Sequence, residues 1–227
     1  MEKRNRDSYG LEWKTLRRDW PLWILLAGLL ITAVWVYPHL PEKVPSHWNI
    51  QGDVDAYSSR SFGAFFAPIL TVGLYFLMLL VPYIDPKRDN YQRFTPAYTF
   101  LRWSLVVFFS VIYAATILAA LNYPINIGLI VKAMVSVLFL IIGNYMGQFR
   151  HNYFVGIRTP WTLANEEVWQ RTHRFGSKIW VTGALVCLAM SLVEAAWGAV
   201  VFFTAVIVMT IIPIIYSYVI FIKLKDN

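Results

Sequence analysis

Long apolar blocks separated by short polar or charged segments dominate the hydrophobic pattern of this chain. Neither the alternation of a half-buried strand nor the heptad repeat of a coiled coil runs through these blocks. A helix needs about 20 apolar residues to cross the hydrocarbon core of a bilayer, so the blocks predict membrane-spanning helices. Six blocks qualify, at about residues 20–37, 62–84, 98–121, 125–146, 179–193 and 196–222. The pattern therefore predicts an all-α polytopic membrane protein of about six transmembrane helices.

The composition agrees with a chain that folds in lipid. Hydrophobic residues make up 58% of the 227 residues and the mean hydropathy is +0.51, whereas soluble domains contain roughly 45–50% apolar residues. The net charge of +7 suits basic loops that hold the membrane topology and face anionic lipid headgroups, so we predict no direct contact with nucleic acid. Cys187 is the single cysteine, so the chain cannot form an intrachain disulfide, and it lies within an apolar block.

Lysine and arginine are distributed unevenly between the two sides that the spans define. Seventeen of the 20 lie in the N-terminal segment, the second-to-third and fourth-to-fifth loops with their adjoining helix ends, and the C-terminal segment. The opposite side carries only Lys43 and Arg60, and Lys132 lies within the fourth span. Cytoplasmic loops carry the excess of basic residues, so both termini are predicted to be cytoplasmic. Residues 1–19 are predicted to form a basic amphipathic tail at the headgroups.

Two connections are longer than a turn between helices requires, and long loops are often functional. The predicted organisation is the tail, then helices 1–4 across residues 20–146 with an extracytoplasmic loop at 38–61, a cytoplasmic loop at 147–178, and helices 5 and 6 within residues 179–227. Prolines in the outer loop exclude a regular helix there, so we expect a folded cap over the outer helix ends. His47, Asp53 and Asp55 are possible metal ligands, but their spacing matches no metal motif, and no metal site is predicted.

The second half of the inner loop predicts a helix on the inner membrane surface. This helix is expected to begin at Thr159 or Thr162 and to end at Gly176. Glu167 and Arg171 are spaced for an ion pair between successive turns. The residues expected on one common face are Val168, Trp169, Thr172 and Phe175, with Trp169 and Phe175 turned toward the bundle.

Polar residues within or beside the spans are the next candidates. Lys132 can extend outward to the headgroups or face a polar bundle interior, and both alternatives stay open. Glu194 lies in the outer turn between the last two spans and could pair with Lys132 if both face inward. Asn144, near the inner end of the fourth span, is a further buried polar candidate.

Catalytic chemistry in the inner loop would have to use His173. Glu166 or Glu167 could complete an acid–base pair, and the anion-binding candidates are Arg150, Arg158 and Arg174. No nucleophile elbow, P-loop, zinc-binding HExxH or paired-cysteine motif accompanies them. The sequence therefore predicts a protein that is not an enzyme and that has no cofactor.

A long run in the inner loop resembles the signature of the SdpI family of bacterial immunity proteins. The matching stretches are residues 143–147, Arg150, residues 152–163, residues 166–169 and residues 172–174. The outer loop is similar to the short domain that often precedes this signature in the family. The matching outer residues are Leu40, Pro41, Val44, Pro45, His47, Asn49 and Gly52. With the helix pattern included, the resemblance covers nearly the whole chain.

The resemblance implies a multi-pass protein of the bacterial cytoplasmic membrane that gives immunity to a secreted peptide or protein toxin. It also implies a possible receptor that holds a cytoplasmic repressor at the membrane, with membrane lipids as further partners. The implied toxin-facing residues are Pro45, His47, Asn49 and Gly52. The implied cytoplasmic signalling residues are Asn144, Arg150, Asn152, Gly156, Arg158, Trp161, Glu167, Trp169, His173 and Arg174.

Two other functions remain as alternatives at this point. One is a membrane enzyme that acts on lipid headgroups at the inner interface with His173, Glu167 and the arginines. The other is a small transporter with Lys132, Asn144 and Glu194 along a polar path. The sequence favours the immunity reading because the family signature is specific, whereas the catalytic set is incomplete and no internal repeat is visible.

Overall fold

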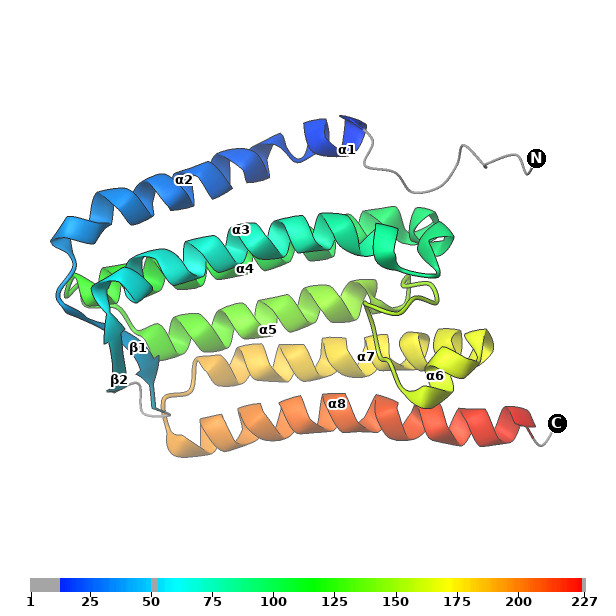
Figure 1. Ribbon diagram of the computed structural model, residues 1–227. Coiled ribbons are helices and arrows are strands. Elements are labelled where there is room, and N and C mark those ends of the chain that lie inside the picture. The colour runs from blue at the N-terminus through cyan, green and yellow to red at the C-terminus, as the bar shows by residue number, and fades with distance from the viewer. Residues whose placement is uncertain (1–12, 50–52, 226–227) are drawn as a thin grey trace.

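Long helices lying side by side make up most of the protein. The structure is a computed structural model that describes residues 13–49 and 53–225. Its elements are α1 Trp13–Arg18, α2 Trp20–Val36, η1 Tyr37–His39, β1 Lys43–Trp48, β2 Val54–Ser59, α3 Arg60–Ile84, η2 Arg88–Phe94, α4 Thr95–Ala120, α5 Ile127–Met146, α6 Pro160–Ala164, α7 Glu166–Ser191 and α8 Ala196–Lys225. In Figure 1, α2 lies at one edge of the array and α8 at the other.

The prediction of a polytopic, mostly helical membrane protein is confirmed. Five segments of the described chain are long and apolar enough to cross a membrane, which are Trp20–His39, Arg60–Ile84, Arg88–Ala120, Ile127–Met146 and Ala196–Lys225. The sixth predicted span, at residues 179–193, does not qualify within the described chain. Its apolar residues form the second half of α7, whose first half is polar, and they are too few to span a bilayer on their own.

The predicted end of the interfacial helix at Gly176 is wrong. The chain forms the short α6 and breaks at Asn165, whose side chain accepts hydrogen bonds from the backbone N–H groups of Glu167 and Val168 and so begins α7. From there α7 continues through Gly176 to Ser191. A Cβ added at Gly176 would lie 2.8 Å from Ile157 Cδ1 and 3.2 Å from Met146 Sδ. This glycine therefore permits close packing and does not end the helix.

The outer loop contains a two-stranded β-hairpin, a small addition to the otherwise all-α fold. β1 and β2 pair antiparallel, with irregular register on either side of His47. The prolines do exclude a helix, but the segment is extended rather than irregular. Val44 of β1 is fully buried, and a Cβ added at Gly63 of α3 would lie 2.6 Å from its Cγ1. The hairpin is thus packed directly on the start of α3, at one end of the bundle (Figure 1).

Arg102 is buried within α4 and is not one of the surface charges that hold the topology. Its Nη2 donates to Asp19 Oδ2 at 2.6 Å, and both side chains are inaccessible to solvent. Trp103 Nε1 and Tyr75 Oη also donate to the Asp19 carboxylate, at 2.9 and 3.1 Å. A buried charge is stable only when it is paired and hydrogen-bonded, so this cluster joins the start of α2 to α3 and α4. The sequence did not predict it.

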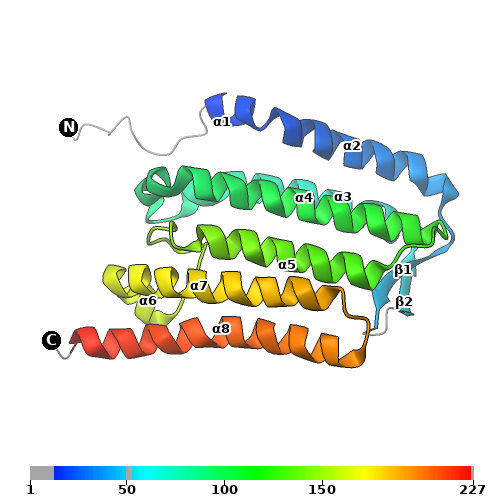
Figure 2. The ribbon, with the colours of Figure 1, turned by 180° about the vertical axis from the view of Figure 1, so that it is seen from behind.

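The basic segments lie at one end of the bundle. The end of the bundle opposite the hairpin holds α1, α6, the connection between α5 and α6, and the C-terminal end of α8 (Figure 1). Figure 2 shows the same arrangement from behind. One apolar cluster joins α2, α3 and α4 with the hairpin. A second joins the inner parts of α3, α4, α5 and α7 with the residues around Phe149 and Trp169. The second cluster supports the inner loop, and the orientation itself remains a prediction from the basic residues.

Candidate functional site

Asn152 organises the first part of the inner loop. Its Oδ1 accepts hydrogen bonds from the backbone N–H groups of Phe154 and Val155, at 2.9 and 2.6 Å. Its Nδ2 donates to the carbonyl groups of Arg150 and Val155, at 2.8 and 2.9 Å. The side chain is fully buried. Asn152 therefore shapes the loop from within and is not available to a soluble partner.

Asp85, at the end of α3, ties this loop to the second-to-third connection. Its Oδ2 accepts hydrogen bonds from Tyr91 Oη and from the backbone N–H of Tyr153, both at 2.9 Å. Asn90 Nδ2 donates to the His151 carbonyl at 2.7 Å. Sequence reasoning missed Asp85 and Tyr91. The available signal was an acidic residue directly after an apolar span, in a connection that is otherwise rich in basic residues.

Trp169 and His173 form the buried centre of the inner site. Trp169 is fully buried, and its Nε1 donates to the Phe149 carbonyl at 2.9 Å. The His173 ring stacks on Trp169 with a centroid separation of 4.1 Å, and the His151 ring lies 5.2 Å from Trp169. The prediction that Trp169 turns toward the bundle is confirmed. The same packing removes Trp169 and His173 from the surface.

The hydrogen bonds of His173 determine its tautomer. The backbone N–H of Ile157 donates to Nε2 at 2.9 Å, so Nε2 carries no proton. Nδ1 then carries the proton and donates to the Trp169 carbonyl at 2.8 Å. Burial lowers the pKa of His173 to about 4 and nearby His151 adds to the decrease, while the hydrogen bond to Trp169 acts in the opposite direction. A neutral imidazole with both nitrogens engaged is unsuited to general-base catalysis.

Gly156 occupies a position that other residues would strain. Its φ is +118°, which side chains rarely adopt, and an added Cβ would collide with His173 Nε2. This close approach lets the next residue, Ile157, donate its backbone N–H to the His173 ring. Gly156 and His173 therefore act as one structural unit that holds the loop against α7.

The α6 segment connects the inner loop to α8. Thr159 begins α6 with a capping box shared with Thr162. Thr159 Oγ1 lies 3.0 Å from Ser217 Oγ of α8 in a buried contact. The rings of Trp161 and Tyr218 pack at 5.0 Å. Any rearrangement of α8 at these positions must therefore also move α6.

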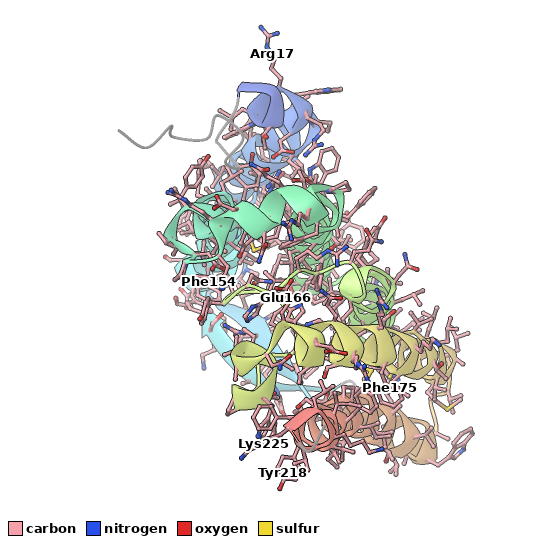
Figure 3. The ribbon with its side chains drawn as sticks, turned by 90° about the vertical axis from the view of Figure 1, so that its right-hand side faces the viewer. Arg17, Phe154, Glu166, Phe175, Tyr218 and Lys225 are labelled. Carbon is pink, nitrogen blue, oxygen red and sulfur yellow. The ribbon has the colours of Figure 1, made fainter. Side chains whose placement is uncertain are left out.

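Other predicted signalling residues lie on the surface of the inner end. Arg158 is exposed and donates from Nη1 to the Tyr153 carbonyl at 2.7 Å. Glu167 and Arg171 form the predicted ion pair at 2.5 Å, which is confirmed. The prediction that Asn144 is buried is wrong, because it faces outward at the inner end of α5. The exposed residues here include Asn144, Tyr153, Phe154, Arg158, Glu166, Glu167, Arg171 and Arg174. Figure 3 looks onto this end, where Arg17 projects away from the labelled residues of the loop, α7 and α8.

The residues predicted to face the toxin have different roles in the hairpin. Asn49 closes the hairpin, because its backbone N–H donates to the Asp53 carbonyl and its Oδ1 accepts from the Asp53 N–H, both at 2.9 Å. His47 Nδ1 lies 2.5 Å from Asp55 Oδ1 in an exposed contact. Pro45 is half-buried in β1. Gly52 lies outside the described residues. Among the described residues, no cluster of three or more His, Cys, Asp and Glu side chains is suited to a metal ion.

A cavity of about 630 Å³ lies between the hairpin, α5 and α8. It is lined by Ser46, His47, Trp48, Asn49, Ile127, Gly128, Val131, Lys132, Ala199 and Phe203. The structure thus brings predicted outer-loop residues together with Lys132, although they are distant in sequence. Glu194 is exposed in the turn after α7, and within the described chain no ion pair joins it to Lys132. The arrangement does not unite Lys132, Asn144 and Glu194 as one path.

Comparison with known proteins finds matches for the regions that contain the inner and outer loops. Residues 148–217 match the SdpI/YfhL protein family, and residues 24–72 match a domain of unknown function, DUF1648. The chain is 27% identical over 205 residues to the immunity protein SdpI of Bacillus subtilis (strain 168), which covers 90% of this chain and 96% of that protein. No solved structure is significantly similar. The resemblance predicted from the inner and outer loops is confirmed.

Proposed function

Because the chain carries the SdpI/YfhL family region and is similar to an immunity protein over most of its length, we propose that it protects its own cell from a secreted peptide toxin. The similarity over 90% of the chain carries the proposal, because it extends far beyond a single motif or loop. The proposed location is the bacterial cytoplasmic membrane, with the basic inner loop in the cytoplasm. The neutral, fully engaged His173 supports this function over a lipid-modifying enzyme.

A receptor function is the finer part of the proposal. A receptor needs two states whose balance is altered by a ligand that binds them unequally. α8 is suited to join the two faces, since Phe203 lines the outer cavity and Ser217 contacts Thr159 of the inner loop. These two α8 residues lie about 21 Å apart along the helix at 1.5 Å per residue. We propose that toxin binding outside displaces α8, and α6 together with it, and so changes the inner surface offered to a cytoplasmic repressor.

Survival of a sensitive bacterium tests the immunity function. Cells that express the wild-type chain should survive secreted peptide toxins that kill cells with an empty vector. His47→Ala alters the exposed outer pair and is expected to reduce survival, whereas Lys87→Ala, at an exposed inner-face position, is the matched control. Failure of the wild type against every toxin in a broad panel would refute the immunity function.

Limited trypsin digestion tests the receptor function separately. Arg158 and Arg174 are exposed cleavage sites on the inner surface. In nanodiscs, a toxin that the wild type protects against should change the cleavage rate at these sites at least severalfold. A Thr159→Val/Ser217→Ala double variant, which lacks the hydroxyl contact between α6 and α8, should show a smaller change. If toxin binding leaves the cleavage rate of the wild type unchanged, the receptor function is refuted and the immunity function is unaffected.

A further inference from the structure

The cavity beside the outer hairpin has the size and position of a ligand site. Its volume of about 630 Å³ falls within the range of about 300–1,000 Å³ that small ligands occupy. The hairpin, α5 and α8 each supply part of the wall. Trp48, Val131 and Phe203 make this wall largely apolar, and they lie beside the polar side chain of Lys132. An apolar molecule with one polar end would match this lining.

The charge of the cavity points to an anionic end. Lys132 and His47 are the ionisable residues in the lining, and neither can carry negative charge. His47 is engaged with Asp55, which lies outside the lining. Within the described chain, Lys132 forms no ion pair or side-chain hydrogen bond. It lies about 7–8 Å along α5 from the first residue of the helix. An unpaired lysine at the membrane is costly, so a carboxylate in the cavity would be stabilised.

The hairpin favours a peptide as the source of that carboxylate. The four consecutive residues from Ser46 to Asn49 line the cavity. Ser46, His47 and Trp48 belong to β1, so this stretch of strand borders the cavity along its length, and its register with β2 is irregular on either side of His47. Within the described chain, β1 has a strand partner on one edge only, which is β2. An extended peptide can hydrogen-bond to such an open edge, whereas an acyl chain cannot.

We propose that this cavity binds the carboxylate-bearing end of an apolar peptide. The Lys132 ammonium pairs with the carboxylate, the peptide backbone lies along β1, and the apolar side chains pack on Val131 and Phe203. The identification of this peptide with the toxin rests on the proposed immunity function. The binding chemistry itself does not, because it follows from the lining of the cavity.

Two matched peptides test the charge requirement. The full-length protein is reconstituted in phosphatidylcholine nanodiscs and titrated with an N-terminally fluorescein-labelled hexapeptide of valine and leucine, with either a free C-terminal carboxylate or an amide. Fluorescence anisotropy should show at least about tenfold tighter binding of the carboxylate form, as expected for one charge-assisted hydrogen bond. Lys132→Gln should abolish this preference, and Lys178→Gln, an exposed lysine on α7, should retain it.

Further variants keep the test decisive. Phe203→Ala should weaken both peptides equally, because it removes apolar wall and leaves the lysine in place. Equal affinity of the two peptides for the wild type, or a preserved preference in Lys132→Gln, would overturn the proposal. Displacement of the peptide by phosphatidylglycerol in wild-type nanodiscs but not in the Lys132→Gln variant would assign the cavity to a lipid headgroup and would also overturn it.

The survival assay separates this inference from the immunity function. If Lys132→Gln loses the carboxylate preference but protects cells as the wild type does, the cavity is not the toxin site and the immunity function stands. If the wild type prefers the carboxylate peptide but protects against no toxin, the immunity function fails and the cavity chemistry stands. Parallel loss of peptide preference and protection in Lys132→Gln would support both.

Discussion

Replacement of Gly156 by alanine should destabilise the inner loop more than any other single methyl addition at its glycines. A residue with a side chain at φ +118° is strained by about 1–3 kcal/mol. The new Cβ would also collide with His173 Nε2. If the loop moves away, the buried imidazole nitrogen loses its hydrogen bond from Ile157, at a cost of about 1–3 kcal/mol. Gly156→Ala should therefore lower the stability by about 2–6 kcal/mol.

The assay is thermal unfolding of the detergent-solubilised protein, followed by tryptophan fluorescence. Gly147→Ala is the matched control, because its added Cβ would have no neighbour closer than 3.9 Å and its φ of −64° is ordinary. The Gly156→Ala variant should unfold several degrees below this control. In a His173→Ala background the collision is absent, so Gly156→Ala should cost less there. Equal melting temperatures for the two glycine variants would show that Gly156 is not held against His173 as described.

Three further variants test the buried ion pair, the histidine and the hairpin in the same unfolding assay. Arg102→Met should cost about 3–5 kcal/mol by leaving a buried carboxylate unpaired, and adding Asp19→Asn should restore part of the loss; no recovery would contradict this. With the folded pKa of His173 at about 4 and an unfolded value near 6.5, stability should be full above about pH 6.5 and should fall by about 3 kcal/mol as the pH decreases to about 4. A His173→Gln variant should lack this part of the decrease. If its stability falls with pH as that of the wild type does, His173 is not the group responsible. Gly63→Ala, where a Cβ would meet β1 at 2.6 Å, should cost about 1–3 kcal/mol, whereas Gly73→Ala, with no neighbour within 4 Å, should be neutral.

The helix positions could be predicted from the sequence because membrane helices depend on local apolar length. Five of the six predicted blocks agree with helices or their interiors to within a few residues. The sixth block lies within α7, which begins earlier than predicted because its polar and apolar halves belong to one helix. Gly176 suggested a stop, but whether glycine ends a helix depends on what packs against it, and here Ile157 and Met146 leave no room for a side chain.

The inner site could be predicted as a segment but not as a set of contacts. The family signature located Asn152, Gly156, Trp169 and His173, and the structure brings them together. Asn152, Trp169 and His173 are buried, so they shape the loop from within and are not offered directly to a partner. Asp85 was missed because its partners come from another connection, and pairing between distant segments leaves no periodic signal in the sequence.

Insertion into a bilayer, the helical spans, the unequal distribution of basic residues and the two long loops could all be predicted from the sequence. These properties follow from composition and local periodicity, which act over a few helical turns. The pairing of Arg102 with Asp19, and the place of Lys132 at an outer cavity with β1 and Phe203, become visible only in the folded protein. Such contacts join segments tens of residues apart, so they depend on how the helices pack against one another.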